Sequence, residues 1–295
     1  MIQIVPGEVN TAKFHSIMLG SVGPRPIAFA STIDPEGRPN LSPFSFFNAF
    51  GSNPPTLIFC PARRVRDNTT KHSLENVKKV PEVVINVVTY NMVHQASLAS
   101  VEYPEGVNEF IKAGFTPEPS VKIKPFRVKE SPVQYECRVK QVIELGNQGG
   151  AGNLIICEVL MVHVAEWVLD ANQNIDQHKI DLVARMGGNW YCRAHGDALF
   201  EVTKPVSTIG VGVDQIPDAI RYSPILTGNN LGQLGNVEQL PNADEVAQFK
   251  QSGELDLMIQ GIPYADFAHH RLAKQLLDQG NVVLAWKVLL ASLIS

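Results

Sequence analysis

The sequence is poor in cysteine and contains no cysteine cluster. Its 295 residues include four cysteines, Cys60, Cys137, Cys157 and Cys192, which are far apart, form no CxxC pair and have no histidine nearby at zinc-ligand spacing. Neither a structural metal site nor a disulfide framework is therefore indicated. We expect buried free thiols and no bound metal.

An excess of charge of one sign is also absent. The chain has 25 Lys and Arg against 29 Asp and Glu, a net charge of -4. Binding to phosphate backbones requires a basic field, so we do not expect nucleic acid as a partner. Charged residues make up 18% and hydrophobic residues 44% without a long biased tract, which excludes a disordered, collagen-like or coiled-coil chain.

Long hydrophobic runs are missing as well. The longest apolar stretch, residues 282–294, is interrupted by Lys287 and is shorter than the roughly 20 residues that span a bilayer. The first residues lack the basic start and apolar run of a signal peptide, so we expect the mature protein to begin near Met1. These features predict a cytoplasmic protein without a membrane partner.

The first two thirds of the chain consist mainly of segments typical of β-strands. Residues rich in Val, Ile and Phe alternate with turn residues, and the expected strands are 26–33, 40–47, 56–60, 82–89, 133–145 and 154–164. The turn at 34–37 and the glycine-rich segment 146–152 are typical hairpin connections. Together they favour an antiparallel barrel.

Helical patterns interrupt and then follow these strands. Short helices are expected at 11–19, 70–79, 91–100 and 108–113, and longer apolar periodicity appears at 242–250, 264–279 and 282–293. No GxGxxG motif follows the first strand, which argues against a Rossmann domain. The glycine-rich run 228–235 lacks the Lys-Ser/Thr of a P-loop, so we interpret it as an ordered loop. We therefore divide the chain into a barrel domain, 1–204, and a loop-rich helical C-terminal extension, 205–295.

Several ordered motifs in the barrel domain carry a family resemblance. They are RPIAFASTID at 25–34, GRPNLSPFSFFN at 37–48, NPPTLIFCP at 53–61, KHSLENV at 71–77, EVVIN at 82–86, EFxxxG at 109–114, Glu158-Val159 and RMGGxxY at 185–191. With these motifs the sequence resembles the flavin reductase-like proteins, which include the flavoredoxins, from about residue 20 to residue 191. The resemblance implies an FMN-binding split β-barrel of the Greek-key type with peripheral helices, and a homodimer.

One segment has the composition that the flavin ring requires. A flat apolar ring with a polar edge needs a wall and hydrogen-bonding groups. Aromatic and polar side chains alternate in the expected contact segment, and by resemblance we assign cofactor binding to Pro43, Phe44, Ser45, Phe46 and Asn48. For Phe46, core packing is about as good an explanation as flavin contact, whereas buried polar side chains such as Ser45 and Asn48 need partners.

The phosphate of the cofactor is expected at residues 63–73. Guanidinium groups, hydroxyls and free N–H groups at a helix start suit an anion, although such a run alone is more often a solvated surface. The resemblance favours an anion site here, and it also assigns cofactor binding to residues at the end of the expected strand 56–60 and just after it. The residues assigned on this basis are Cys60, Pro61, Ala62, Arg66, Asn68, Thr69, Lys71, His72 and Ser73. His72 and Ser73 replace the Asp and Thr that are common in the family.

Three further positions bear on activity. Arg185 matches the late family motif near the flavin, and a salt bridge at a dimer interface explains it comparably well. Some similar proteins carry a histidine near the nicotinamide just before the strand at 154–164, where this chain has Gly152 and Asn153. His163 is a weaker second candidate, because a lone strand histidine is more often structural.

The resemblance implies an NAD(P)H-dependent flavin reductase in which hydride passes from the nicotinamide of NADH or NADPH to flavin N5. The cofactor performs this chemistry, so no catalytic side chain is assigned. Two alternatives stay open. A flavoredoxin-like carrier would hold FMN and pass electrons to a redox protein partner without oxidising NAD(P)H, and a scaffold would bind no flavin. In either reductase or carrier, residues 220–222 and 229–231 of the extension are candidates for a lid.

Overall fold

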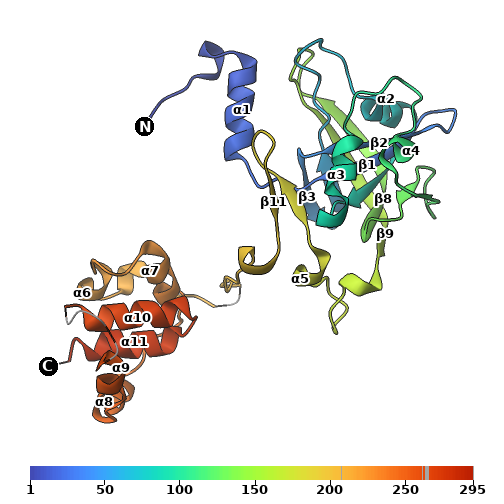
Figure 1. Ribbon diagram of the computed structural model, residues 1–295. Helices are drawn as coiled ribbons and strands as arrows, with labels where there is room; N and C mark the ends of the chain where they lie inside the picture. The colour runs from blue at the N-terminus through green and yellow to red at the C-terminus, as the bar shows by residue number, and fades with distance from the viewer. Residues whose placement is uncertain (207, 261, 263–265, 295) are drawn as a thin grey trace. The chain divides into compact units, whose positions relative to one another are not determined.

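The computed structural model describes residues 1–206, 208–260, 262 and 266–294. They form two compact units, Met1–Phe200 and Glu201–Ser295 (Figure 1). The first unit contains the β-structure, and the second is entirely helical in its described part apart from connecting segments.

A seven-stranded antiparallel sheet is the centre of the first unit, in the order β2-β1-β5-β8-β9-β4-β3. The strands are β1 (Ala28–Ile33), β2 (Pro39–Phe44), β3 (Phe47–Ser52), β4 (Pro55–Phe59), β5 (Glu82–Val87), β8 (Val133–Glu144) and β9 (Asn153–Val164). The predicted hairpin turn at 34–37 is confirmed, with the Gly37 amide donating to the Asp34 carbonyl at 3.0 Å and Gly37 at a φ of +82°.

The sheet must curl, because its two edges are joined by a very short link. β2 and β3 lie at opposite edges, yet only Ser45 and Phe46 separate Phe44 from Phe47. Three peptide steps span at most about 11 Å, so the two edges meet at this point. The single strand expected at 40–47 is therefore wrong: the chain leaves one edge and starts the other, and the periodicity continues across the break.

Strand β1 separates two cores. Phe29 faces a cluster with Ala96 and Phe110 from the helices, whereas Ala28 and Ala30 face a second cluster that contains Leu74. All six residues of β1 are buried. The four cysteines are free, and burial raises the pKa of the Cys137 thiol to about 12. Among the described residues, no group of acidic, His or Cys side chains could hold a metal ion.

Short helices and small strands surround the sheet. They are η1 (Pro6–Glu8), α1 (Thr11–Ser21), α2 (His72–Lys79), η2 (Tyr90–Met92), α3 (Val93–Leu98), α4 (Glu109–Ala113), β6 (Pro117–Glu118), β7 (Arg127–Val128), η3 (Glu166–Val168), α5 (Gln177–Ile180), β10 (Val183–Arg185), β11 (Tyr191–Arg193) and η4 (Gly196–Ala198). Helices α2, α3 and α4 pack on the sheet through buried residues, but no residue of α1 is buried.

The second unit is a helical bundle with a core of its own. Its helices are η5 (Val213–Gln215), α6 (Asp218–Arg221), α7 (Gly228–Gly235), α8 (Ala243–Gln251), α9 (Glu254–Gln260), α10 (Ala268–Asp278) and α11 (Val282–Ala291). The fully buried Trp286 donates its indole N–H to the Leu234 carbonyl at 3.0 Å. No helix in the described ranges is both long and apolar enough to cross a membrane.

Two expectations for this unit need correction or qualification. The run 228–235 is helix α7 instead of a loop, because Thr227 and Asn230 form a capping box and Leu234 is buried in the core. The helix expected at 264–279 begins at residues outside those described, and α10 covers its later part. Of the lid candidates, Ile220 and Asn230 are buried within the helical unit itself.

Candidate functional site

A cleft of about 400 Å³ lies where the two sheet edges meet a hairpin and a helix. Ile27, Pro43 and Ser45 line it from the ends of β1 and β2, and Ser97 and Ser100 line it from α3 and the residues after it. The β10–β11 hairpin contributes Arg185, Asn189 and Tyr191. Of the predicted cofactor-binding residues, the structure therefore brings Pro43, Ser45 and Arg185 together here.

Arg25 holds this hairpin against the start of β1. Its backbone exchanges two hydrogen bonds with that of Arg185, both 2.9 Å long. Its guanidinium, 5% exposed as a residue, donates to the carbonyls of Leu19 at 2.7 Å, Val22 at 2.6 Å and Met186 at 2.9 Å. Burial, and then the positive charge of Arg185, lower the pKa of Arg25. Arg185, which lines the cleft, thus has a second, buried guanidinium group as its neighbour.

Arg185 presents its charge to the cleft beside an aromatic ring. Its guanidinium carbon lies 4.6 Å from the centre of the Tyr191 ring and it donates to the Gly188 carbonyl at 3.0 Å. Within the described part of the chain, no ion pair joins Arg185 to a carboxylate. By contrast, Arg193 on the same hairpin is neutralised by Asp181, at 2.7 and 2.8 Å.

A more apolar hollow of about 210 Å³ adjoins the cleft and shares Val93, Ser97 and Tyr191 with it. Tyr90 and Val183 also line it, and the Arg193 guanidinium stacks over the Tyr90 ring at 3.8 Å. Aromatic and aliphatic walls of this kind suit a planar group.

A small polar pocket lies on the other side of Ser100. Its volume is about 20 Å³, and Ser100 lines both this pocket and the large cleft. The predicted phosphate residues Lys71, His72 and Ser73 line it. The predicted ring residues Pro43, Ser45 and Arg185 therefore line the large cleft, and these predicted phosphate residues line the pocket that shares Ser100 with it.

Helix α2 begins inside this pocket. Lys71 occupies the N-cap position, and its carbonyl accepts from the Leu74 amide at 2.9 Å. Ser73 is buried and its hydroxyl accepts from the Asn40 side chain at 2.8 Å, which fixes the helix start to β2. Burial, followed by the charge of Arg64, lowers the pKa of Lys71.

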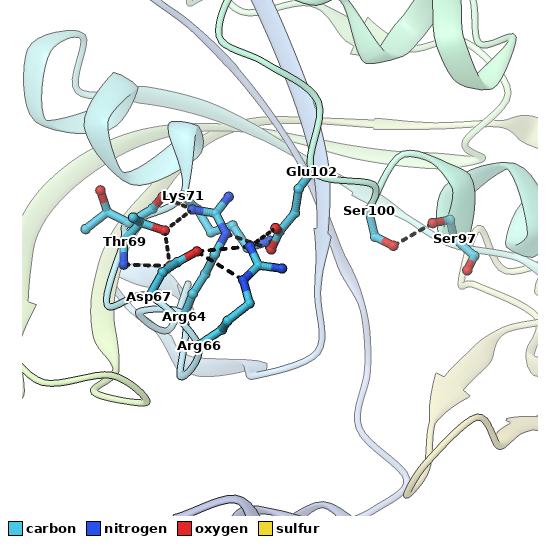
Figure 2. A network of polar contacts seen from close by, with 9 residues as sticks. Arg64, Arg66, Asp67, Thr69, Lys71, Ser97, Ser100 and Glu102 are labelled. Carbon is cyan, nitrogen blue, oxygen red and sulfur yellow. Dashed lines mark hydrogen bonds and ion pairs between the residues drawn. The ribbon is translucent and has the colours of Figure 1, made fainter.

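Three cations beside the pocket converge on Glu102, as Figure 2 shows. Arg64 donates to Glu102 at 2.7 Å and Arg66 donates to it at 2.8 Å, while the Lys71 ammonium lies 3.7 Å from it. Arg64 also donates to the Thr69 hydroxyl at 2.7 Å, and Arg66 donates to Asp67 at 2.9 Å. We call Arg64, Arg66 and Lys71 the cation cluster. Of the predicted phosphate residues, Arg66 and Lys71 belong to it, and Thr69 is hydrogen-bonded to its Arg64.

The other predicted ring residues lie away from the lining of the cleft. Phe44 is 8% exposed and packs on Phe59 with ring centres 5.4 Å apart. Phe46 makes an edge contact with His15, and Asn48 lies on the exposed strand β3, where its side-chain oxygen accepts from the amide of Ala49. Their side chains have structural contacts in this chain.

The end of β4 is tied to the start of β9. The buried Asn153 donates to the Pro61 carbonyl at 2.8 Å, and Cys60 lies against Gly152, where an added Cβ would come within 2.8 Å of its sulfur. Ala62 follows in the partly buried connection. Asn68, at a φ of +56°, accepts from the Arg63 guanidinium at 2.8 Å.

His163 has a buried partner that explains it without a catalytic role. It lies 2.6 Å from a carboxylate oxygen of Glu136, which is 0% exposed and also accepts from the Val121 and Lys122 amides. Among the lining residues that sequence reasoning overlooked are Ser97, Ser100, Glu102 and Asn189. Asn189 is at an unspecified position of the motif at 185–191 and the other three lie outside the quoted motifs, so only the tertiary arrangement identifies them.

Comparison with known proteins agrees with this arrangement. Residues 20–179 match the family model of the flavin reductase like domain. An uncharacterized protein of Aquifex aeolicus is 35% identical over 201 residues, which cover 68% of this chain and 100% of that protein. The matched segment corresponds to the β-containing unit.

Two solved structures are similar in fold and sequence. Nitrilotriacetate monooxygenase component B from Bacillus cereus has a TM-score of 0.64 and 28% identity, covering 68% of this chain and 98% of its own. A protein of Shewanella frigidimarina, assigned as a flavin reductase with a split barrel domain, has a TM-score of 0.57 and 26% identity, covering 67% and 95%. The mainly β split-barrel fold with peripheral helices is therefore confirmed, and the chain belongs to the flavin reductase like family of flavin-related oxidoreductases.

Proposed function

We propose that this chain binds FMN and reduces it with NADH or NADPH. One observation carries the proposal: Ser100 lines both a cleft of about 400 Å³ and a small pocket of about 20 Å³ that is bordered by a cation cluster. The cleft falls in the range of about 300 to 1,000 Å³ typical of ligand sites. A planar ring with a phosphate tail needs both parts in this order.

The ring end offers walls and positive charge. Ser45 lies between β2 and β3, outside both strand ladders, so its backbone can be directed to the polar edge of the ring. Arg185, with Arg25 behind it, would stabilise negative charge that develops at that edge on reduction. Pro43 and Tyr191 supply apolar contact surface.

The phosphate end offers groups that suit a dianion. Lys71 and Arg66 carry positive charge, and the hydroxyls of Ser73 and Thr69 are nearby. The proposed cofactor set remains Pro43, Phe44, Ser45, Phe46, Asn48, Cys60, Pro61, Ala62, Arg66, Asn68, Thr69, Lys71, His72, Ser73 and Arg185. Residues of this set that do not line the hollows would act by positioning those that do.

The FMN ring, when bound, supplies the hydride acceptor for the nicotinamide. The adjoining hollow beside Tyr90 and Tyr191 gives the second ring room next to the first. This chain's residues would stack and orient the two rings and exclude water, which is the part of the catalysis that proximity provides. Arg185 would supply the charge, and no acid or base side chain is needed.

We also propose that the active form is a homodimer. No residue of α1 is buried, although it carries Phe14, Ile17 and Met18, and an isolated helix of this length is marginal in water. In β3, no residue is fully buried, and Phe50 is 63% exposed on this edge strand. A second copy that packs on α1 and β3 would bury the apolar side chains of the helix and cover the exposed edge strand.

The test is to load the protein with FMN, remove free flavin by gel filtration and then measure bound flavin and nucleotide oxidation. The proposal predicts about one FMN per subunit and oxidation of NADH or NADPH that depends on it. Reduced flavin would then reach an acceptor, and the monooxygenase component among the similar structures makes a redox protein the natural choice. Failure to retain FMN at any concentration would contradict the proposal.

A second candidate is a flavoredoxin-like carrier that holds FMN but does not oxidise NAD(P)H. The observation that favours it is Asn153, which occupies the position where some similar proteins have a nicotinamide-contacting histidine. Here its side chain is buried and bound to the Pro61 carbonyl. The carrier predicts retained FMN with no nucleotide oxidation in the same experiment.

A further inference from the structure

We propose that Glu102 is a built-in competitor for the phosphate of the ligand. In this account its carboxylate occupies the cation cluster in the free protein and leaves when a dianionic phosphate monoester binds, so Glu102 sets the phosphate affinity of the site. The inference rests on the proposed function for the identity of the ligand, FMN, but its electrostatic part can be tested with inorganic phosphate alone.

The geometry shows an anion already seated on the cations. Arg64 and Arg66 donate to different oxygens of the same Glu102 carboxylate, at 2.7 and 2.8 Å, and Lys71 approaches it at 3.7 Å. The carboxylate reaches the cluster from the segment after α3, whereas the cations come from the segment before α2 (Figure 2). A phosphate has the same need for several donors, so it competes for the same groups.

The charge balance of the cluster disfavours binding the Glu102 carboxylate and a phosphate monoester at the same time. Arg64, Arg66 and Lys71 contribute three positive charges, and Asp67 and Glu102 contribute two negative ones. A phosphate monoester adds about -1.5 to -2 near neutral pH. With Glu102 in place the cluster would become net negative, whereas without it the charges nearly cancel.

Glu102 remains ionised under these conditions, because hydrogen bonds from Arg64 and then Arg66 lower its pKa. The segment that carries it can move at small cost. Its backbone hydrogen bonds are local, such as those from the Val101 amide to the Leu98 carbonyl and from the Tyr103 amide to the Val101 carbonyl, and the Glu102 side chain is 40% exposed. A carboxylate released from the cations would enter water and not the core.

An alternative role for Glu102 is to position Arg64 and Arg66 for the phosphate. The two roles predict opposite effects of Glu102→Gln on the affinity for FMN. If Glu102 competes, Glu102→Gln strengthens FMN binding while it destabilises the free protein, because the cations then repel one another without a counter-charge. If Glu102 positions the arginines, the same substitution weakens FMN binding and also destabilises the free protein.

The experiment compares wild-type protein with Glu102→Gln and with the matched control Glu105→Gln, an exposed carboxylate on the same segment that is not in the cluster. Affinities for FMN and riboflavin are measured by quenching of flavin fluorescence. We expect Glu102→Gln to bind FMN about tenfold more tightly, since one charge-assisted hydrogen bond or more no longer has to be broken. Riboflavin binding and the Glu105→Gln control should not change.

Inorganic phosphate provides a probe that does not depend on flavin. Its stabilising effect on the melting temperature should be larger for Glu102→Gln than for wild type, and Glu102→Asp, with its shorter reach, should lie between them. If no variant binds flavin but this order holds, the proposed function fails and the competitor role stands. If FMN binds but Glu102→Gln weakens it, or if phosphate stabilises all variants equally, the inference is overturned.

Discussion

The Arg185 guanidinium carbon lies 4.6 Å from the centre of the Tyr191 ring, and the two residues are direct partners across the β10–β11 hairpin. Both line the large cleft. The ring holds the guanidinium at one place by a cation–π contact while the charge itself stays unpaired with any carboxylate among the described residues. In the proposed flavin site this pair is the fixed positive charge of the ring wall.

Arg185→Gln should lower the reduction potential of bound FMN, because the reduced flavin loses a positive neighbour. A tenfold loss of affinity for the reduced form relative to the oxidised form corresponds to about 30 mV for two electrons. The potential is measured by anaerobic titration against a reference dye. Arg193→Gln is the matched control, since Asp181 already neutralises that guanidinium. An equal shift in both variants would contradict the assignment.

Lys71→Ala should weaken FMN much more than riboflavin. The half-buried ammonium contributes a charge-assisted hydrogen bond worth about 1.5 to 3 kcal/mol to a phosphate, and riboflavin has no phosphate. Arg66→Ala should act in the same direction but more weakly, because the Arg66 side chain is 74% exposed and screened by water. Fluorescence titrations with both flavins measure the difference. Equal losses for the two ligands would place the phosphate elsewhere.

Phe50→Glu should convert the proposed dimer to a monomer. It puts a charge on the exposed strand β3, where a partner subunit would have to bury it. Light scattering after gel filtration measures the mass. Ile111→Glu, at an apolar residue of α4 that is 77% exposed, serves as the control and should not alter the mass. A wild-type chain that is monomeric at all concentrations would contradict the proposed dimer.

Trp286→Ala should destabilise the helical unit by about 3 to 5 kcal/mol, the usual effect of deleting a large buried aromatic side chain. If the two units are independent domains, FMN affinity should stay unchanged while the helical unit unfolds at a lower denaturant concentration. Trp167→Ala, at a residue of the first unit that is 59% exposed, is the control. Loss of FMN binding in Trp286→Ala would instead support a lid role for the helical unit.

The strands were predictable because their chemistry is local. β1, β5 and β9 are apolar segments bounded by turn residues, and the sequence analysis located each within two residues of its observed ends. The break between Phe44 and Phe47 was not predictable, since the apolar pattern continues through it and only the curl of the sheet interrupts the ladder. Helix α7 was missed because a buried core and a capping box outweigh five glycines and asparagines of low helix propensity.

The candidate site also contains residues that the sequence predicts and residues that only the fold reveals. Lys71, Ser73 and Arg185 were predicted from the family resemblance, with a basic run before a helix as support for the first two, and all three line the hollows. Ser100 and Glu102 carry no such signal: they reach the hollows only when the segment after α3 is folded against α2. Alternation in a strand does not distinguish a core aromatic from one that contacts a flavin, and Phe44 packs in a core cluster.

The most direct test of the central claim is the visible spectrum of the FMN-loaded protein under anaerobic conditions while NADH or NADPH is added. The account predicts that the flavin band bleaches rapidly with at least one nucleotide, as expected if hydride reaches the bound ring. A flavin that stays oxidised with both nucleotides but bleaches with dithionite would contradict the reductase function and identify a carrier. A protein that holds no flavin at all would contradict the site itself.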